Sequence, residues 1–330
     1  MQKQTMMTGC LPAFGRHRGY PPRWGWLRKV HLAIQNDPGA MTRPDATVEL
    51  GVNKSMVPAM GFWSQAFGLA RREGRDLVPT DRARWLLDDD HGADPFIELD
   101  VTLWLLHWWL LSAEPCHVPS WRYLFGIAGL NRYSRRELQR RLAWTADDNG
   151  WKPPAHSVLT ADIACLVSMY GLSDDTAADF EDVLSNPFRT LQLLSSEPPG
   201  EDVADRSHLV SIHRRAGSRC PAIIQAYASI DFAARAFGTA AGSISLTRLS
   251  SDPLGPGRLL LADTAVLRHA LHRVAARHPD HLAVVQSGDG EEMLTFSSRP
   301  DHLAEHLLDT AYPGPGAEWR REVHARGREA

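Results

Sequence analysis

The sequence predicts a mainly α-helical protein with small β hairpins, in which winged helix-turn-helix elements at both ends flank a helical middle. Apolar residues recur at the helical period in many segments, and two hairpin patterns follow groups of predicted helices. The 330 residues are 43% hydrophobic and 23% charged, which excludes a disordered chain and is enough for two or three cores. We expect domains over residues 1–112, 113–195 and 206–330.

The first winged helix-turn-helix pattern lies within residues 24–79. A helix over 24–35 follows Pro21 and Pro22, and an extended segment over 47–52 leads to a second helix over 54–67. Residues 69–79 have short apolar ends around a basic tip, which is typical of a hairpin. A three-helix packing unit without a DNA partner would show the same apolar pattern.

A tryptophan-rich helix is predicted next, beginning at Asp94 or at Asp100 and ending near Leu111. Its most apolar run, 101–111, is much shorter than the ~20 residues of a membrane span. Ser134 and Glu137 form a capping box that starts a helix ending at Asn149-Gly150.

Another helix is predicted over 157–170. Together with the helix that starts at Ser134, it forms a second helix-turn-helix candidate. Beyond it, residues 174–215 are rich in loop-forming residues, and 195–205 have the composition of a linker.

The C-terminal part repeats the order of helices followed by a hairpin. We expect helices over 221–237, 243–249 and 263–277, with Asp263 as the N-cap of the last. A short strand is expected over 257–261. Residues 282–296 then form a hairpin around Gly288-Asp289-Gly290, and a final helix covers 301–311.

Cysteine use and the N-terminal composition predict a cytoplasmic protein. The four cysteines, Cys10, Cys116, Cys165 and Cys220, stand far apart and form no Cys-x-x-Cys pair, so we expect reduced, mostly buried thiols. Residues 1–10 contain one lysine and no apolar segment, which is unlike a secretory signal.

Charge is segregated along the chain although the net charge is only −3. Residues 1–36 carry six basic residues and no acidic one, and residues 132–141 carry five arginines and one glutamate. Residues 88–100 carry six acidic residues and no lysine or arginine. Such segregation favours a locally anionic partner, although charged residues also cover solvated helix faces.

Most common enzyme motifs are absent from the sequence. It has no phosphate-binding Gly-x-x-x-x-Gly-Lys-Ser/Thr loop, no Gly-x-Gly-x-x-Gly after a strand, no His-Glu-x-x-His and no Gly-x-Ser-x-Gly. The pairs His269/His272 and His278/His281 lack a completing ligand, so we interpret them as surface histidines. No metal site is therefore predicted.

The candidate site residues combine basic side chains with a few polar ones. Arginines and aromatic residues interleave over 14–29, a pattern that suits phosphate pairing and stacking, or an arm that simply packs on the first domain. His17 is the candidate general base of this stretch. The expected DNA-binding residues are Arg16, Arg18, Arg23, Arg28, Lys29, Lys54, Ser55, Gln65, Arg71, Arg72 and Arg135.

Five motifs are distributed over nearly the whole chain: Arg23-x-Gly25-Trp26-Leu27-Arg28-Lys29, residues 50–57, Trp104-Leu105-Leu106-His107-Trp108, Asn186-Pro187-Phe188-Arg189 and Gly255-Pro256-Gly257-Arg258. They resemble the motifs of one bacterial family of unknown function that is found in DNA phosphorothioation and defence gene clusters. The chain is similar to the SspB-like components of the Ssp system. The resemblance implies DNA nicking, and three kinds of partner protein: a cysteine desulfurase, an ATPase and a sulfur-transfer protein.

One departure affects the expected chemistry. The family usually has His-Glu-Thr-Phe where this chain has His17-Arg18-Gly19-Tyr20, so a carboxylate is replaced by a positive charge. We therefore expect a component that binds double-stranded DNA and either nicks it or presents it for sulfur insertion. Nicking would require a divalent metal such as Mg²⁺ or Mn²⁺. The alternatives are a non-catalytic, sequence-specific DNA-binding regulator and a scaffold that meets acidic proteins.

Overall fold

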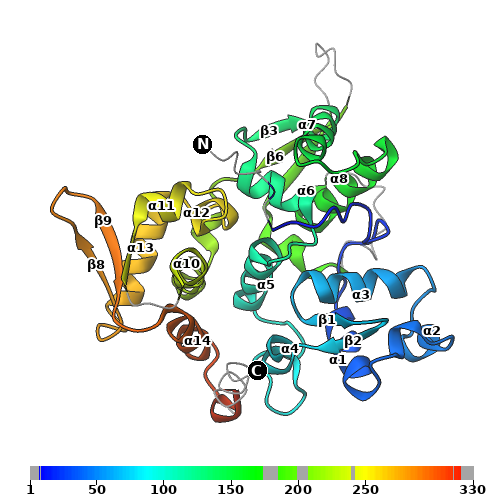
Figure 1. Cartoon of the computed structure of the whole chain (residues 1–330), viewed down its shortest axis with the longest axis horizontal. Helices are drawn as coiled ribbons and strands as arrows, with labels where there is room; N and C mark the ends of the chain where they lie inside the picture. The colour runs from blue at the N-terminus through cyan, green and yellow to red at the C-terminus, as the bar shows by residue number, and fades with distance from the viewer. Residues whose placement is uncertain are drawn as a thin grey trace.

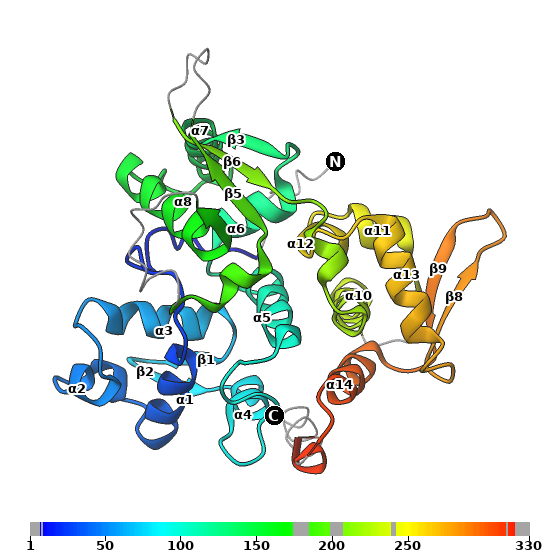
Figure 2. The same ribbon diagram turned by 180° about the vertical axis from the view of Figure 1, so that it is seen from behind.

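The computed structural model describes residues 7, 9–173, 185–198, 207–238, 242–314 and 316–320. Helices dominate, with three small sheets among them, which confirms the mainly α-helical class (Figure 1). The N-terminal elements lie on one side of helix α5 (Asp100–Ser112), and the C-terminal elements lie on the other (Figure 2). Within the described residues, no helix combines the length and apolar character that a membrane span requires.

The N-terminal elements follow the predicted order with one exception. The helix expected over 24–35 is α1, and the hairpin of β1 and β2 pairs Ala70 with Pro79. Its two-residue turn contains Gly74 at φ 62°, a conformation that favours glycine. These elements are α1 (Trp26–Asn36), α2 (Ala46–Leu50), α3 (Met56–Ala66), β1 (Ala70–Glu73), β2 (Asp76–Pro79) and α4 (Asp81–Leu87).

The exception is the segment over 47–52. The prediction that it is extended is wrong. Residues Ala46–Leu50 form the short helix α2, and Gly51 ends it in the left-handed conformation at φ 63°. The side chain of Lys29 donates a hydrogen bond to the carbonyl of Leu50 at 3.0 Å. Tertiary contact with α1 thus satisfies a free carbonyl at the end of this helix.

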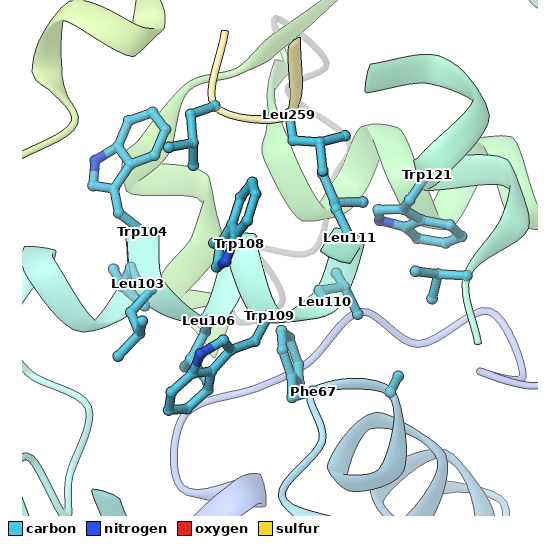
Figure 3. Close-up of a cluster of buried hydrophobic side chains, with 14 of the residues drawn as sticks. Phe67, Leu103, Trp104, Leu106, Trp108, Trp109, Leu110, Leu111, Trp121 and Leu259 are labelled. Atoms are coloured by element: carbon cyan, nitrogen blue, oxygen red, sulfur yellow. The ribbon is translucent and has the colours of Figure 1, made fainter. Parts of the chain in front are cut away.

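Helix α5 is the centre of the core. It begins at Asp100 because Asp94, the other expected start, folds back and accepts hydrogen bonds from the amides of Glu98 and Leu99. Every residue from Thr102 to Ser112 is buried, including three tryptophans (Figure 3).

Polar contacts connect α5 to distant elements. Trp108 Nε1 donates to Asp231 and Trp109 Nε1 donates to the hydroxyl of Tyr227, both at 2.8 Å and both toward α10 (Ala222–Phe237). These pairs supply the hydrogen bonds that buried indole groups require, and they hold the two sides of the molecule together.

The middle of the chain contains a four-stranded sheet in the order β3-β6-β5-β4. Helix α7 begins as predicted, with the Ser134 hydroxyl accepting from the Glu137 amide at 3.1 Å. The elements are α6 (Pro119–Arg122), β3 (Arg132–Ser134), α7 (Arg135–Asp148), α8 (His156–Tyr170), β4 (Gly171–Ser173), β5 (Leu194–Glu197) and β6 (Leu209–Ile212).

This sheet combines strands from two of the expected domains. Residues 194–197 form strand β5 rather than the start of a linker, and residues 199–206 lie outside the described part. Strand β6, expected in the third domain, pairs with β3 and β5. The sheet therefore contains residues from both sides of the predicted boundary.

Of the six elements predicted in the C-terminal part, four are confirmed: the helices α10, α13 and α14 and the hairpin of β8 and β9. The other two are corrected. Asp263 caps α13 by accepting from the Val266 amide at 2.9 Å, and β8 and β9 form the expected hairpin. The strand expected over 257–261 is helical, and the helix expected over 243–249 begins as strand β7. The elements are α10, β7 (Gly242–Ser245), α11 (Leu246–Ser251), α12 (Pro256–Leu259), α13 (Thr264–Ala275), β8 (Leu282–Gln286), β9 (Glu292–Phe296) and α14 (Pro300–Ala311).

Candidate nucleic-acid interface

A groove of about 660 Å³ lies where the N-terminal arm, helix α3 and the β1–β2 hairpin meet. The arm, residues 9–25, runs between α3 and the α6–α8 region (Figure 1). It contributes Arg16 and Arg18 to the groove, α3 contributes Gln65, and the hairpin contributes Arg72. Four of the predicted DNA-binding residues, from three separate segments, are thus brought together.

The groove is strongly basic. Arg75 at the hairpin tip joins the three arginines already named, and none of the described residues lining the groove is acidic. The side chains of all four arginines are exposed. Such a concentration of guanidinium groups is suited to phosphate oxygens, which arginine binds in a bidentate manner.

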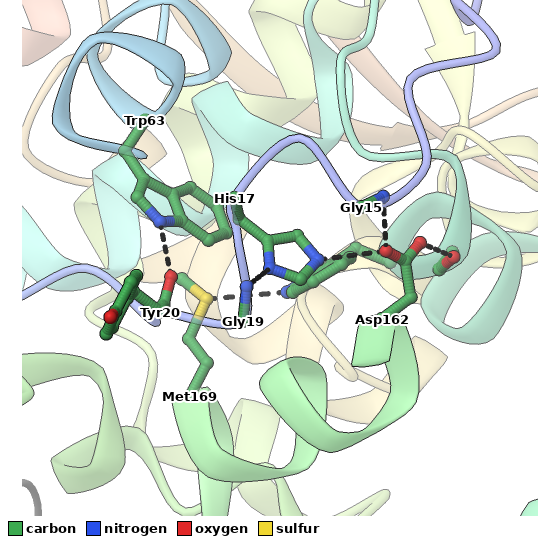
Figure 4. Close-up of polar contacts among 9 residues, drawn as sticks. Gly15, His17, Gly19, Tyr20, Trp63, Asp162 and Met169 are labelled. Carbon is green, nitrogen blue, oxygen red and sulfur yellow. Dashed lines mark hydrogen bonds and ion pairs between the residues drawn. The ribbon is translucent and has the colours of Figure 1, made fainter. Parts of the chain in front are cut away.

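The arm is fixed in place by a buried hydrogen-bond network around Asp162 of α8 (Figure 4). One carboxylate oxygen accepts from Gly15 N at 2.7 Å and from His17 Nε2 at 2.9 Å. The other accepts from the Ser120 hydroxyl at 2.6 Å. Since Asp162 and His17 are each only 1% exposed, this network anchors the two arginines that flank His17.

Both ring nitrogens of His17 are occupied. The amide of Gly19 donates to Nδ1 at 3.0 Å, so Nδ1 is unprotonated and Nε2 carries the hydrogen that Asp162 accepts. The ring also packs against Trp63 and Trp121, at centroid distances of 6.1 and 5.5 Å. In this arrangement His17 faces protein on all sides, and a role as general base would require the arm to move.

The arm also contacts α3 and the residue before it. Trp63 Nε1 donates to the Tyr20 carbonyl at 2.8 Å, and the hydroxyls of Tyr20 and Ser55 lie 3.1 Å apart. Eight of the eleven α3 residues are buried. The helix therefore presents only a narrow free face, on which Gln65 is half-buried and lines the groove.

Three other predicted DNA-binding residues make contacts within the protein. Arg28 pairs with Asp89 at 2.7 Å and lies 4.7 Å from the ring centre of Phe96. Lys29 caps α2, as described above, and Arg23 lies over the rings of Tyr20 and Trp26.

The last three lie apart from the groove or beside it. Arg135 is the first residue of α7, and it donates to the Ser196 hydroxyl of β5 in the central sheet at 3.1 Å. Lys54 is exposed just before α3. Arg71 pairs with Glu73 and lines a second groove of about 580 Å³, which shares Gln65 and Arg72 with the first.

The sequence did not identify His117 or Arg75 as site residues. His117 lines both grooves, and its buried Nδ1 has no hydrogen-bond partner among the described residues. Burial lowers the pKa of His117 and keeps the ring neutral near pH 7. It follows the buried helix α5 in sequence, and only the folded structure shows that it faces the arm. Arg75 lies in the basic tip of the predicted hairpin, and this position could have identified it from the sequence.

His107, which the family-like motif contains, is enclosed in the core. Its Nδ1 lies 2.8 Å from the Tyr170 hydroxyl and its Nε2 lies 2.8 Å from the Leu259 carbonyl. Burial lowers its pKa to about 4. This histidine therefore joins α5, α8 and α12 and is remote from solvent.

The acidic segment 88–100 also has structural roles. Asp88 accepts from the amides of Asp90 and His91, and Asp94 organises the entry to α5. In the described part of the chain, no group of three or more His, Cys, Asp or Glu residues is arranged to hold a metal ion. The groove residues by themselves thus do not fit a Mg²⁺ site, which needs oxygen ligands.

Comparison with known proteins connects this geometry to a family. Residues 14–312 match the family described as "Protein of unknown function (DUF4007)". The chain belongs to the DUF4007 family. No curated protein matches it.

Two solved structures resemble this DUF4007 protein over nearly its whole length. One is described as "Magnesium ion-bound SspB crystal structure", with 36% identity and a TM-score of 0.83. The other is described as "SspB crystal structure", with 35% identity and a TM-score of 0.81. In each case 98% of both chains is covered. The similarity to SspB that the sequence motifs predicted is confirmed.

Proposed function

We propose that this protein is the DNA-binding component of an Ssp phosphorothioation system and holds duplex DNA against the arginine groove. The observation that carries the proposal is the convergence of Arg16 and Arg18 with Arg72 and Arg75 on one groove without acidic lining residues. Duplex DNA carries a regular array of phosphates, and contacts to them supply most of the affinity of such proteins.

The order of elements favours duplex DNA, rather than an isolated anion, as the ligand of this groove. Helices α1, α2 and α3 followed by the β1–β2 hairpin is the order of a winged helix-turn-helix, in which the hairpin lies along the backbone. Because most of α3 is buried, we propose that the arm and the hairpin make the main phosphate contacts. Base contacts are then limited to Gln65 and to Ser55 at the start of α3.

We further propose that the bound strand is nicked at this groove. Water attacks the phosphorus as His117 takes its proton, the bond from phosphorus to one sugar oxygen breaks, and this leaving oxygen takes a proton from solvent. Burial lowers the pKa of His117 and so keeps a neutral imidazole beside the groove near pH 7, and its buried, unpartnered Nδ1 can accept the proton once a local movement admits the water. The surrounding guanidinium groups stabilise the negative charge that develops on the phosphate. A cut strand would then be available to the ATPase, cysteine desulfurase and sulfur-transfer partners that the SspB resemblance implies.

Fluorescence anisotropy with a labelled duplex, measured over a range of salt concentrations, tests the binding proposal. The four groove arginines contribute about −3.6 to the slope of log affinity against log salt, and a phosphate contact by Lys54 adds about −0.9. The double variant Arg72→Ala/Arg75→Ala reduces the magnitude of this slope by about 2, whereas Arg277→Ala, an exposed arginine outside the groove, leaves it unchanged. Salt-independent binding, or an equal effect of the control, contradicts the proposal and favours a protein scaffold.

Relaxation of supercoiled plasmid, with Mg²⁺, Mn²⁺ or chelator, tests the cleavage step. We expect His117→Ala to abolish nicking while duplex affinity stays within about twofold, and we expect His272→Ala, an exposed histidine elsewhere, to retain both. Full nicking by His117→Ala removes this residue from the mechanism. A purified protein that binds but never nicks supports the alternative, a regulator or a subunit that presents DNA.

A further inference from the structure

Cys10 and Cys116 lie directly opposite each other, although 105 residues separate them in the sequence. They form an isolated parallel β-bridge. Leu11 N donates to the Cys116 carbonyl at 2.8 Å, and Cys116 N donates to the Gly9 carbonyl at 2.7 Å. Backbones paired in this way are ~4.8 Å apart and direct the two side chains to the same side. This spacing falls within the ~4.4–6.8 Å between Cα atoms that a disulfide requires.

The two thiols lie in different environments. Both cysteines are free; Cys10 is half-buried, and Cys116 is buried with its thiol donating to the Leu110 carbonyl at 3.8 Å. Burial opposes ionisation of Cys116, but the hydrogen bond from Cys10 and the charge of Arg122 outweigh it and lower the pKa of Cys116 to about 7. By contrast, burial raises the pKa values of Cys165 and Cys220. The thiolate, which reacts with oxidants, is therefore favoured at Cys116 alone among the three buried cysteines.

The pair stands at the edge of the arginine groove. Leu11 and His117, the residues that follow the two cysteines, both line it. Cys10 belongs to the same arm as Arg16 and Arg18, whereas Cys116 belongs to the segment that joins α5 to α6. In the reduced protein, two backbone hydrogen bonds join the arm to this segment, and Cys10 also packs against the hydrophobic core.

We propose that Cys10 and Cys116 form a disulfide under oxidising conditions and that this bond locks the start of the arm beside the groove. Each thiol loses one proton and one electron as the sulfur–sulfur bond forms. With hydrogen peroxide as the oxidant, the two electrons and two protons reduce it to two water molecules. Because the backbones are already paired, the bond closes without moving the arm, and the groove keeps its shape.

Oxidation of the full-length protein with hydrogen peroxide, followed by mass spectrometry, tests the pairing. We expect the intact mass to fall by two hydrogen atoms, and a non-reducing digest to yield a peptide pair linked through Cys10 and Cys116. The double variant Cys165→Ser/Cys220→Ser keeps this product, and Cys10→Ser abolishes it. Cys10 is half-buried, so this variant disturbs the core less than a change at Cys116.

Hydrogen–deuterium exchange then measures the effect on the arm. In the oxidised protein we expect slower exchange over residues 11–18 than in the reduced protein, and no such difference in Cys10→Ser. An unlinked monomer after peroxide, a link to another cysteine, or a linked protein with unchanged exchange overturns the proposal. These readouts use no DNA, so failure of the binding proposal leaves them unaffected.

Discussion

The imidazole Nε2 of His17 and the carboxylate of Asp162 are 2.9 Å apart, although 145 positions separate the two residues in the sequence. The contact joins the N-terminal arm to α8, and neither side chain reaches solvent. It decides where Arg16 and Arg18 lie, because these residues flank the anchored histidine. The arm is therefore part of the folded core and not an independent tail.

We predict that His17→Ala destabilises the protein and also weakens duplex binding. Loss of the ring leaves Asp162 with one donor fewer and opens a cavity beside Trp63 and Trp121, which together cost about 3 kcal/mol of unfolding free energy. Urea unfolding measures this loss. The exposed His272→Ala is the control and should change stability by less than about 0.5 kcal/mol.

The same variant separates two roles for His17. If His17 anchors the arm, its loss lowers stability, DNA affinity and any nicking together. If His17 is a general base, its loss removes nicking alone and leaves the unfolding free energy and the DNA affinity unchanged. The second pattern would contradict the structural role and return His17 to the position of catalytic base.

A second prediction concerns Arg28, which the sequence grouped with the DNA-binding residues. Its guanidinium is committed to Asp89 and to the face of Phe96. We expect Arg28→Ala to leave duplex affinity within about twofold and to lower stability by about 0.5–1 kcal/mol, because the pair is partly exposed. A loss of affinity as large as that of the Arg72→Ala/Arg75→Ala variant would show that the DNA also reaches α1.

The third prediction is a loss of stability in mild acid that depends on His31. This residue of α1 is 2% exposed, and neither ring nitrogen has a hydrogen-bond partner among the described residues. Burial, together with the charge of Arg84, lowers its pKa from 6.5 to about 4. Between these values the unfolded chain binds a proton that the native protein does not bind, so stability falls as the pH is lowered from 6.5 toward 4.

The change His31→Leu removes this titration. Unfolding free energies at pH 7.5, 6 and 5 should fall less steeply in the variant, and the difference should approach about 3 kcal/mol near pH 4 at most. At pH 7.5 the two proteins should be close in stability, because leucine fills a similar volume. An identical pH dependence would show that His31 already binds a proton in the native state.

The contrast between α3 and α12 shows how far sequence patterns determine the elements. Residues 56–66 have apolar spacing and a Pro58 that fits the first turn, so the pattern alone predicts the helix. Residues 257–261 are a short segment that ends in three leucines, which also fits a strand. Residues 256–259 instead form α12, in which Gly257 packs so closely on Ser250 that an added Cβ would lie 2.5 Å from its Cα. Such a contact depends on the folded structure, and the local pattern of so short a segment does not distinguish a helix from a strand.

The candidate site shows the same division. The basic arm and the basic hairpin could each be recognised from composition, since each is a local run of charge. That they face one groove depends on Asp162, on the Cys10–Cys116 bridge and on Trp63, all distant in sequence. Arg28 and Lys29 belong to the same basic run but turn toward the protein. A run of charge thus identifies the segment and not the individual contacts.

The last prediction concerns base recognition by α3. The Ser55 hydroxyl lies within hydrogen-bond distance of the Tyr20 hydroxyl, whereas Gln65 donates one amide hydrogen to the Gly61 carbonyl and lines the groove. Glutamine pairs with adenine in the major groove, and such a contact is worth ~1–3 kcal/mol. We therefore expect Gln65→Ala to change sequence preference more than Ser55→Ala does.

Sequencing of duplexes selected from a randomised library measures this preference. Lys54→Ala is the matched control, because an exposed lysine that contacts phosphate weakens binding to all sequences about equally and lowers the salt slope by about 0.9. An unchanged preference in Gln65→Ala, together with unchanged total affinity, would mean that α3 does not read bases. Sequence choice would then depend on the shape of the duplex, to which the arm and hairpin arginines respond through the phosphate backbone.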